Sequence, residues 1–249
     1  MKARIVHTLI AALATCAFAA GCGTPTNNTT NVTNLTNGVN SSAGTVNSAA
    51  SNAANTTSDA ANPPSLHTTT EQWPSAPKMT IDTAKTYDAI VHTNYGDFTI
   101  QLDAKDSPIT VNNFVFLAKH NFYHDCTFFR IIKNFMVQTG DPNNNGTGGP
   151  GYTIPDELTH QYPFTKGVVA MANSGQPHTG GSQFFICTVD DTKVFQPPNN
   201  KYTEFGRVVS GMNVVEKIAS IPVTNNPQTG ELSYPLATAY IKSIDIEVK

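Results

Sequence analysis

The residues of this chain that could carry out chemistry gather between Phe128 and Pro142, where one arginine lies in an otherwise apolar strand pattern. Arg130 stands between phenylalanine and isoleucine, and Gln138 follows in the next apolar stretch. An unpaired charge is too costly to bury, so the Arg130 side chain must be hydrogen-bonded or must face a cleft. The pattern therefore predicts a guanidinium group that donates hydrogen bonds at an apolar surface.

Two patterns resemble metal sites, but each lacks a ligand that such a site needs. The run 141–146 matches the first half of an EF-hand calcium loop, yet Tyr152 stands where the loop requires a bidentate carboxylate. His120 and His124 have the spacing of a zinc-protease helix, but Asn121 replaces the glutamate and no third ligand is evident. We therefore expect no metal ion and no other cofactor.

Two further patterns fail as phosphate or nucleophile sites. Residues 146–151 are rich in glycine, but the Gly-Lys-Ser/Thr of a phosphate-binding loop does not follow. Ser182 follows Gly181 but lacks the second glycine of a nucleophile elbow. What remains is chemistry without a nucleophile, a metal or a pair of carboxylates, which suits rotation about a bond.

Three blocks of the sequence point to the same kind of enzyme. The first surrounds Arg130, the second is Met171-Ala172-Asn173, and the third runs from Gly181 to Thr188. In this order and spacing the blocks resemble the cyclophilin-type peptidyl-prolyl isomerases, and the resemblance covers Tyr87 to Lys249. It implies an enzyme that accelerates rotation about Xaa-Pro bonds. The alternative is a noncatalytic module or scaffold that binds proline peptides in the same groove.

Rotation about a Xaa-Pro bond is slow because resonance stiffens the C–N bond and sets a barrier of about 20 kcal/mol. A hydrogen-bond donor that draws lone-pair density back onto the prolyl nitrogen, or stabilises the twisted amide, lowers this barrier without proton transfer. By resemblance, Arg130 matches the catalytic arginine of the family, and Gln138 matches the glutamine that orients its guanidinium.

The resemblance also assigns the residues that would hold the substrate. Three match the residues that seat the proline ring: Phe135, Met136 and Phe185. Three match the groove that binds the flanking peptide backbone: Ala172, Asn173 and Gln183. Gly146 matches the nearby glycine-rich loop, and Tyr202 matches a position at the rim of the groove. Phe195 also lies at the rim, where it would replace part of the apolar area of a tryptophan that many members have. Each apolar residue taken alone reads as ordinary barrel core, and only the joint pattern with Arg130 favours a binding site.

The rim departs from the usual family pattern. Many members have a Trp-Leu pair after the third block, whereas residues 191–195 contain no tryptophan and an insertion with Pro197-Pro198 follows. Phe129 also replaces the histidine often found before the arginine. Neither change removes the proposed donor, but without the indole we expect only weak binding of cyclosporin-type macrocycles.

Short strands and two helices must position these residues. Residues 87–95 and 97–103 alternate apolar and polar side chains around a turn, which predicts a hairpin. Asp106-Ser107-Pro108 predicts the start of a helix, because a capping residue precedes proline. Further strands are predicted at 127–132, 135–139, 168–172, 183–188, 204–209 and 237–248, and a second helix at 214–219.

Many short strands between Gly/Pro turns, together with two helices, indicate a mainly β fold, a closed antiparallel β-barrel with helical caps. The resemblance implies eight strands in this barrel and two capping α-helices. Residues 86–249 would form this catalytic domain, since roughly 160 residues are enough for one core.

The N-terminus reads as an export signal over residues 1–21. Lys2 and Arg4 precede an apolar run that is too short and too rich in alanine for a good membrane span. Small residues stand directly before Cys22, as in the cleavage box of bacterial lipoproteins, so we expect lipidation of Cys22. Cys16 is a rival acceptor, and ordinary secretion without a lipid is the alternative.

Residues 22–85 read as a lipid-anchored, disordered tether. From Thr24 to Asn62 the chain is almost entirely Asn, Thr, Ser, Ala and Gly, and such a segment cannot bury enough apolar surface to offset the entropy of ordering. We therefore expect an extracytoplasmic protein held to a bacterial membrane. Its partners would be proline-containing, unfolded or partly folded exported proteins. The net charge of −3 and the lack of a basic block argue against nucleic-acid binding.

Cys126 and Cys187 would remain in the mature domain. They could pair in an oxidising compartment, but both lie in apolar, strand-like runs. We therefore prefer free, buried thiols.

Overall fold

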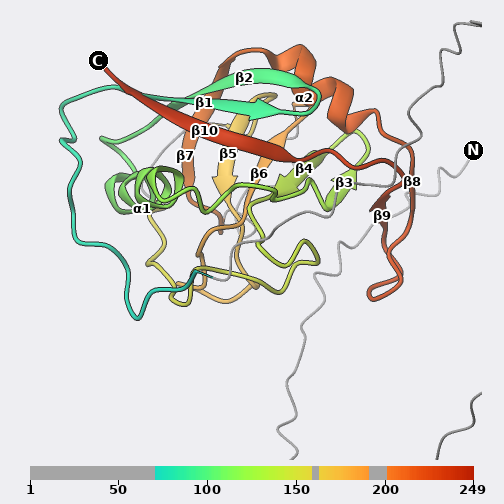
Figure 1. Cartoon of the computed structure of the whole chain (residues 1–249), viewed down its shortest axis with the longest axis horizontal. Helices are drawn as coiled ribbons and strands as arrows, with labels where there is room; N and C mark the ends of the chain where they lie inside the picture. Colours follow the sequence, from blue (N-terminus) through green and yellow to red (C-terminus); the bar gives the residue numbers. More distant parts are fainter. Residues whose placement is uncertain (1–70, 159–162, 191–200) are drawn as a thin grey trace, which may run out of the picture. The chain divides into compact units, whose positions relative to one another are not determined.

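The structure, a computed structural model, describes residues 71–158, 163–190 and 201–249 (Figure 1). These residues form two helices, α1 (Pro108–Lys119) and α2 (Met212–Ala219). Their strands are β1 (Tyr87–Thr93), β2 (Gly96–Leu102), β3 (Arg130–Ile132), β4 (Met136–Thr139), β5 (Val168–Met171), β6 (Phe184–Cys187), β7 (Glu204–Ser210), β8 (Val223–Asn225), β9 (Leu232–Pro235) and β10 (Ile241–Val248). None of the helices found in these ranges is long and apolar enough to cross a bilayer.

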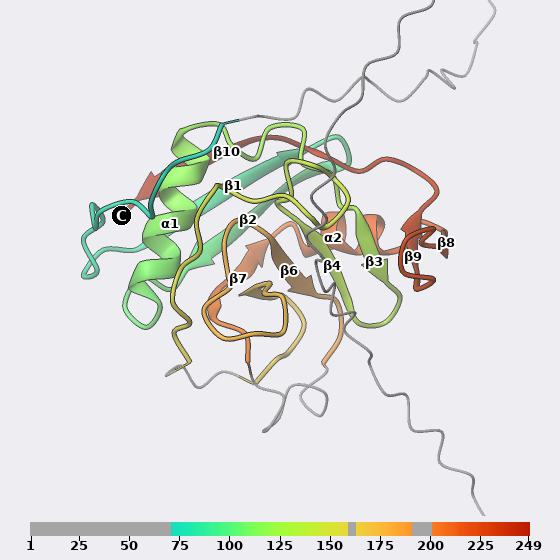
Figure 2. The ribbon, with the colours of Figure 1, turned by 90° about the horizontal axis from the view of Figure 1, so that it is seen from below.

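Eight strands form one antiparallel sheet in the order β10-β1-β2-β7-β5-β6-β4-β3. This confirms the predicted mainly β, eight-stranded antiparallel fold with two helices, but the prediction of a closed barrel is wrong. The two edge strands, β3 and β10, share no ladder in the described residues. Instead, backbone hydrogen bonds and the Thr127–Tyr240 bridge join the segment before β3 to the start of β10. The short β3 contacts β9 instead, so the barrel is open on this side (Figure 2).

The predicted elements are confirmed with shifted ends, except for one hairpin that the sequence did not reveal. β3 begins at Arg130 rather than at residue 127, and β10 begins at Ile241 rather than at residue 237. The additional hairpin, β8–β9, forms a separate two-stranded sheet. Its two strands have only three and four residues, too few to show the alternation of apolar and polar residues that marks a strand.

The main core is formed by the sheet and both helices, since it includes buried side chains of α1 and of α2. It is rich in aromatic side chains, and the largest fully buried ones include Phe98, Phe114, Phe184 and Phe205. α1 contacts β10, and α2 contacts β2 and β4, so the helices cover different parts of the sheet (Figure 2). Cys126 and Cys187 are buried thiols that are not joined in a disulfide, as preferred from the sequence. Burial raises the pKa of the Cys126 thiol, which keeps it protonated and unreactive.

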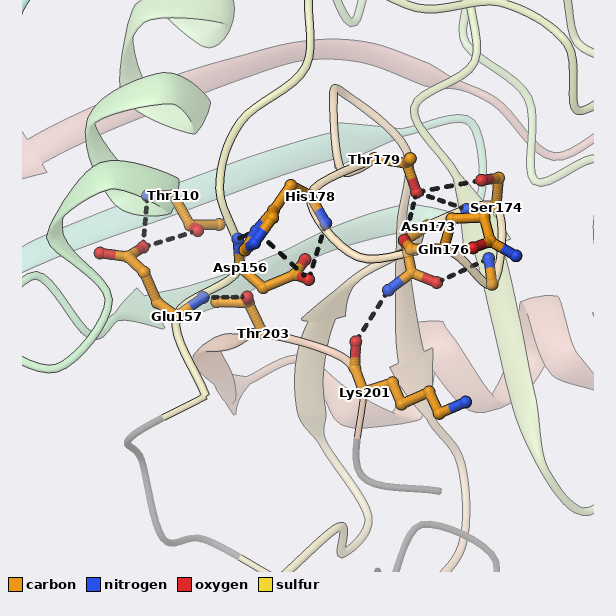
Figure 3. A network of polar contacts seen from close by, with 11 residues as sticks. Thr110, Asp156, Glu157, Asn173, Ser174, Gln176, His178, Thr179, Lys201 and Thr203 are labelled. Atoms are coloured by element: carbon orange, nitrogen blue, oxygen red, sulfur yellow. Dashed lines mark hydrogen bonds and ion pairs between the residues drawn. The ribbon is translucent and has the colours of Figure 1, made fainter. Parts of the chain in front are cut away.

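The start of α1 is stabilised by a residue far away in the sequence. Ser107 is the N-cap residue, but its hydroxyl donates to the Glu204 carbonyl at 2.6 Å instead of accepting from the first helical turn. The Glu157 carboxylate takes this place and accepts from the N–H groups of Ile109 at 2.9 Å and Thr110 at 2.8 Å. Figure 3 shows the contact with Thr110. A carboxylate at a helix N-terminus is also favoured by the helix dipole. The predicted helix start is therefore correct, but its predicted cap is not.

The segment before β1 packs on α1, although the sequence assigned it to the tether. The Trp73 ring makes edge contacts with Phe116 and His120, at centroid distances of 5.1 and 5.7 Å. Asn112 accepts from the Thr80 N–H at 2.9 Å. The folded part of the chain therefore includes residues 71–85, ahead of the predicted boundary at residue 86.

Candidate active site

The register of the sheet places the predicted catalytic pair side by side with an aromatic residue. Arg130 on β3 pairs with Gln138 on β4, and Gln138 pairs with Phe185 on β6. Residues that pair directly across strands have their side chains on the same face of a sheet. Their strand neighbours Ile131 and Phe184 belong to the main core, on the opposite face. The row Arg130–Gln138–Phe185 therefore lies on the outer face and is carried by three strands.

A second apolar cluster borders this row on the outer face. It consists of Met136, Phe164, Val168, Ala170, Phe185 and Cys187, with Ile132, Phe135, Ala172 and Tyr202 packed against it. All three residues predicted to seat a proline ring are thus brought together. Met136 is 2% exposed and Phe185 is 5% exposed, so the half-buried Phe135 offers more surface to a ligand. The sequence did not single out Phe164, whose ring stacks against Phe185 from a loop.

A chain of hydrogen bonds connects Arg130 to the glycine-rich loop. Arg130 Nη1 donates to Gln138 Oε1 at 3.0 Å, and Gln138 Nε2 donates to Gln183 Oε1 at 3.0 Å. Gln183 Nε2 donates to the carbonyls of Gly146 at 3.1 Å and Gly148 at 2.9 Å. Both N–H groups of Gln183 are used in this way, and its oxygen orients Gln138. The resemblance implied that Gln183 binds the peptide backbone, but these two donors are already taken. Gln138 in turn must present its oxygen to Arg130.

The loop that ends this chain of hydrogen bonds is held by the buried Asp141. Its carboxylate accepts from four backbone N–H groups, those of Asn143, Asn145, Gly146 and Gly148. Asp141 therefore anchors a turn, and the described residues contain no cluster of three His, Cys, Asp or Glu side chains suited to a metal ion. Gly140, at φ +84°, comes so close to the Ser182 carbonyl that a Cβ there would lie 2.5 Å from it.

Asn173 and Tyr202 lie next to strands of the sheet, Asn173 shortly after β5 and Tyr202 shortly before β7. Asn173 Nδ2 donates to the Lys201 carbonyl at 2.7 Å, which fixes the chain leading into β7 (Figure 3). The Tyr202 ring packs edge-on against Phe185 at 5.3 Å. Burial raises the pKa of the Tyr202 hydroxyl, and the positive charge of Arg130 opposes this rise. Tyr202 therefore packs against the aromatic cluster and lies near enough to Arg130 to feel its charge.

Arg130 has a second partner that was not predicted from the sequence. Its Nε donates to Glu231 Oε2 at 2.6 Å, and its Nη2 donates to Glu231 Oε1 at 2.8 Å. This side-on ion pair is bidentate, and both side chains remain about one-third exposed, at 29% and 34%. Glu231 directly precedes β9, so the unpredicted hairpin brings a carboxylate to the predicted arginine.

Two of the predicted functional residues lie outside the described residues. These are the lipidation residue Cys22 and the rim residue Phe195. The other predicted positions are brought to one face of the sheet or to the loop beside it.

The fold and the site define a class of protein. A curved antiparallel sheet that presents an Arg–Gln pair beside a cluster of aromatic and aliphatic side chains has the features needed for a peptidyl-prolyl isomerase. The family model "Cyclophilin type peptidyl-prolyl cis-trans isomerase/CLD" matches residues 89–243. The chain belongs to this family of enzymes.

Relatives from several organisms support this assignment. The chain is 41% identical over 162 residues to peptidyl-prolyl cis-trans isomerase-like 3 of chicken. The aligned region covers 63% of this chain and 93% of the relative. It is 42% identical over 138 residues to a peptidyl-prolyl cis-trans isomerase of Helicobacter pylori, covering 54% of this chain and 82% of the relative. The match to the mouse peptidylprolyl isomerase domain and WD repeat-containing protein 1, at 45% identity, covers only 21% of that longer protein.

Solved structures of the family have the same fold. A cyclophilin type peptidyl-prolyl cis-trans isomerase of Cryptosporidium parvum matches with a TM-score of 0.58 at 28% identity, over 65% of this chain and 98% of the other. The same enzyme was also solved in the presence of the dipeptide Ala-Pro, with a TM-score of 0.57.

Proposed function

We propose that this protein catalyses cis-trans isomerisation of Xaa-Pro bonds in exported proteins as they fold. The observation that carries this proposal is the guanidinium of Arg130, which Gln138 holds on the outer face of the sheet beside the apolar cluster around Phe185. The apolar surface suits a proline ring, and the guanidinium suits a twisted amide. The predicted export signal and the predicted lipidation of Cys22 support the choice of exported substrates.

The energetic demand on this site is moderate. Turnover on the millisecond scale requires about five decades of acceleration, or about 7 kcal/mol. One charge-assisted hydrogen bond supplies about 1.5–3 kcal/mol of this. The remainder must come from binding the peptide in a twisted conformation against an apolar, partly dry surface, where a preoriented donor is most effective.

The purified protein is expected to accelerate isomerisation of an Ala-Pro peptide in a protease-coupled assay. The rate should rise linearly with protein concentration, far above the uncatalysed rate of about one event per tens to hundreds of seconds. A noncatalytic binding module would instead bind the peptide saturably without changing its isomerisation rate. If the folded protein binds the peptide but does not accelerate its isomerisation, the proposed activity is wrong and the protein is a peptide-binding module.

Membrane anchoring provides a separate prediction. The full-length chain, expressed in a bacterium, should partition into detergent, and Cys22→Ser should abolish this partitioning because two acyl chains at Cys22 supply the anchor. Cys16→Ser is the matched control and should leave anchoring intact, since residue 16 is removed with the signal. Incorporation of labelled fatty acid into Cys22→Ser would show that another residue or pathway is used.

A further inference from the structure

The ion pair between Arg130 and Glu231 is not part of the mechanism described so far. Glu231 lies 101 positions after Arg130 in the chain, on the β8–β9 hairpin, which forms a two-stranded sheet of its own. We infer that Glu231 is a positioning residue that fixes the Arg130 guanidinium for catalysis. Its charge also disfavours substrates with an acidic residue beside proline. This inference rests on the proposed isomerase activity.

The hairpin holds the Glu231 backbone firmly. The Asn226 N–H donates to the Glu231 carbonyl at 2.7 Å, and the Gly230 N–H donates to the Asn226 carbonyl at 2.7 Å. Gly230 has φ +73°, a conformation that glycine adopts without strain. β9 contacts β3, the strand that carries Arg130. The turn is therefore closed by its own hydrogen bonds and is placed directly against the strand that carries the arginine.

The distribution of hydrogen bonds on the guanidinium fixes its orientation. A guanidinium has five N–H donors in one plane. Glu231 takes the Nε donor and one Nη2 donor, and Gln138 takes one Nη1 donor. One N–H on each terminal nitrogen remains for the substrate. Because the group is held along one edge by Glu231 and at Nη1 by Gln138, it cannot rotate its remaining donors away from a bound amide.

The charge of Glu231 also determines what a peptide meets at this site. Hydrogen bonding to Arg130 keeps the pKa of Glu231 below its usual value, so the carboxylate is ionised at neutral pH. The two opposite charges largely cancel at a distance, although the free N–H groups still act at close range. A peptide with an acidic residue beside proline therefore gains little from Arg130 and is repelled by the nearby carboxylate.

The same experiment also tests the opposite role, in which Glu231 competes with the substrate for the donors of Arg130. If the carboxylate merely occupied donors that the substrate needs, removing it would accelerate catalysis. If it positions the guanidinium, removing it slows catalysis through kcat, because the donor is then misplaced in the transition state, while KM changes less. The sign of the change in kcat separates the two roles.

The experiment compares wild type with Glu231→Gln and Glu231→Asp, using Ala-Pro peptides that carry Lys, Gln or Glu next to proline. We expect Glu231→Gln to lower kcat on the Gln peptide about 3- to 10-fold, and Glu231→Asp to recover part of this loss. The ratio of kcat/KM for the Glu peptide to that for the Lys peptide should rise at least about threefold in Glu231→Gln, because the cation is then uncompensated. An unchanged ratio, or a higher kcat, overturns the inference.

Glu216→Gln is the matched control. Glu216 lies on α2 and pairs with Lys166, so this variant also removes one carboxylate from an ion pair. It should change neither kcat nor the preference between the peptides. Thermal unfolding of each variant excludes loss of the fold as the cause of any change.

A spectroscopic readout separates this inference from the proposed activity. In ¹⁵N NMR spectra, the Arg130 Nε–H of wild type should be protected from exchange and shifted by its hydrogen bond, and Glu231→Gln should reduce both effects. An Arg130 signal that is the same in both proteins overturns the inference and leaves the isomerase activity standing. A wild type that shows the expected signal but no turnover overturns the proposed activity and, with it, the catalytic role of the pair.

Discussion

Replacing Arg130 with alanine is expected to lower kcat/KM for an Ala-Pro peptide by at least about 100-fold, a loss of about 2.7 kcal/mol of transition-state stabilisation. The guanidinium is the charged donor in the row Arg130–Gln138–Phe185, and the neighbouring side chains are an amide and an aromatic ring. Neither can replace a charge-assisted hydrogen bond to the twisted amide. The measurement is the protease-coupled assay on folded protein.

Two further variants sharpen this prediction. Arg130→Lys should restore little activity, because an ammonium group cannot bind Glu231 along one edge and Gln138 at another terminus while still donating to the substrate. Arg207→Ala removes an exposed arginine on β7 and should retain wild-type rates. Near wild-type turnover by a folded Arg130→Ala protein would refute the proposed mechanism.

Replacing Phe184 with alanine is expected to destabilise the domain by about 3–5 kcal/mol. Phe184 is fully buried, and its ring makes edge contacts with Phe114 at 5.5 Å, Tyr123 at 5.7 Å and Phe205 at 6.2 Å. Deleting the ring removes these contacts and leaves a cavity between β6, α1 and β7. The loss is a large share of the total stability of a typical domain, about 5–15 kcal/mol.

Urea unfolding, followed by far-UV circular dichroism, measures this change. Phe184→Leu is the matched variant, because it retains much of the apolar volume and should lose only about 1–2 kcal/mol. Equal losses for both variants would mean that the aromatic contacts, rather than the cavity, dominate. A loss below about 1 kcal/mol for Phe184→Ala would show that the core collapses around the missing ring.

The sequence revealed those parts of the site that lie within regular, strongly patterned strands. Arg130 stood out because a charge interrupts an apolar run, and Phe185 belongs to a strand that is apolar throughout. Once these strands pair in register, the row of outward side chains follows from the two-residue period of a strand. The resemblance supplied the roles of Gln138 and Tyr202, which periodicity alone does not distinguish from surface residues.

The parts that were missed depend on contacts between distant segments. Glu231 lies in a polar turn, and nothing in its local sequence indicates that the hairpin reaches β3. The same holds for Glu157, which caps α1 from a loop, and for Trp73, which packs on α1 from a segment rich in proline and polar residues. Such positions carry no periodic signal because a single side chain, rather than a repeated face, makes the contact.

The pairing of β1 with β10 has a consequence for how the chain acquires its structure during synthesis. Tyr87 on β1 pairs with Val248 on β10, so the first strand of the sheet obtains this neighbour from the opposite end of the domain. A chain that emerges from its N-terminus therefore cannot complete the sheet until residues 241–248 have been made, and contacts of such long sequence separation form slowly. The nascent domain stays incompletely folded until that point, because β1 still lacks one of its two neighbours in the sheet.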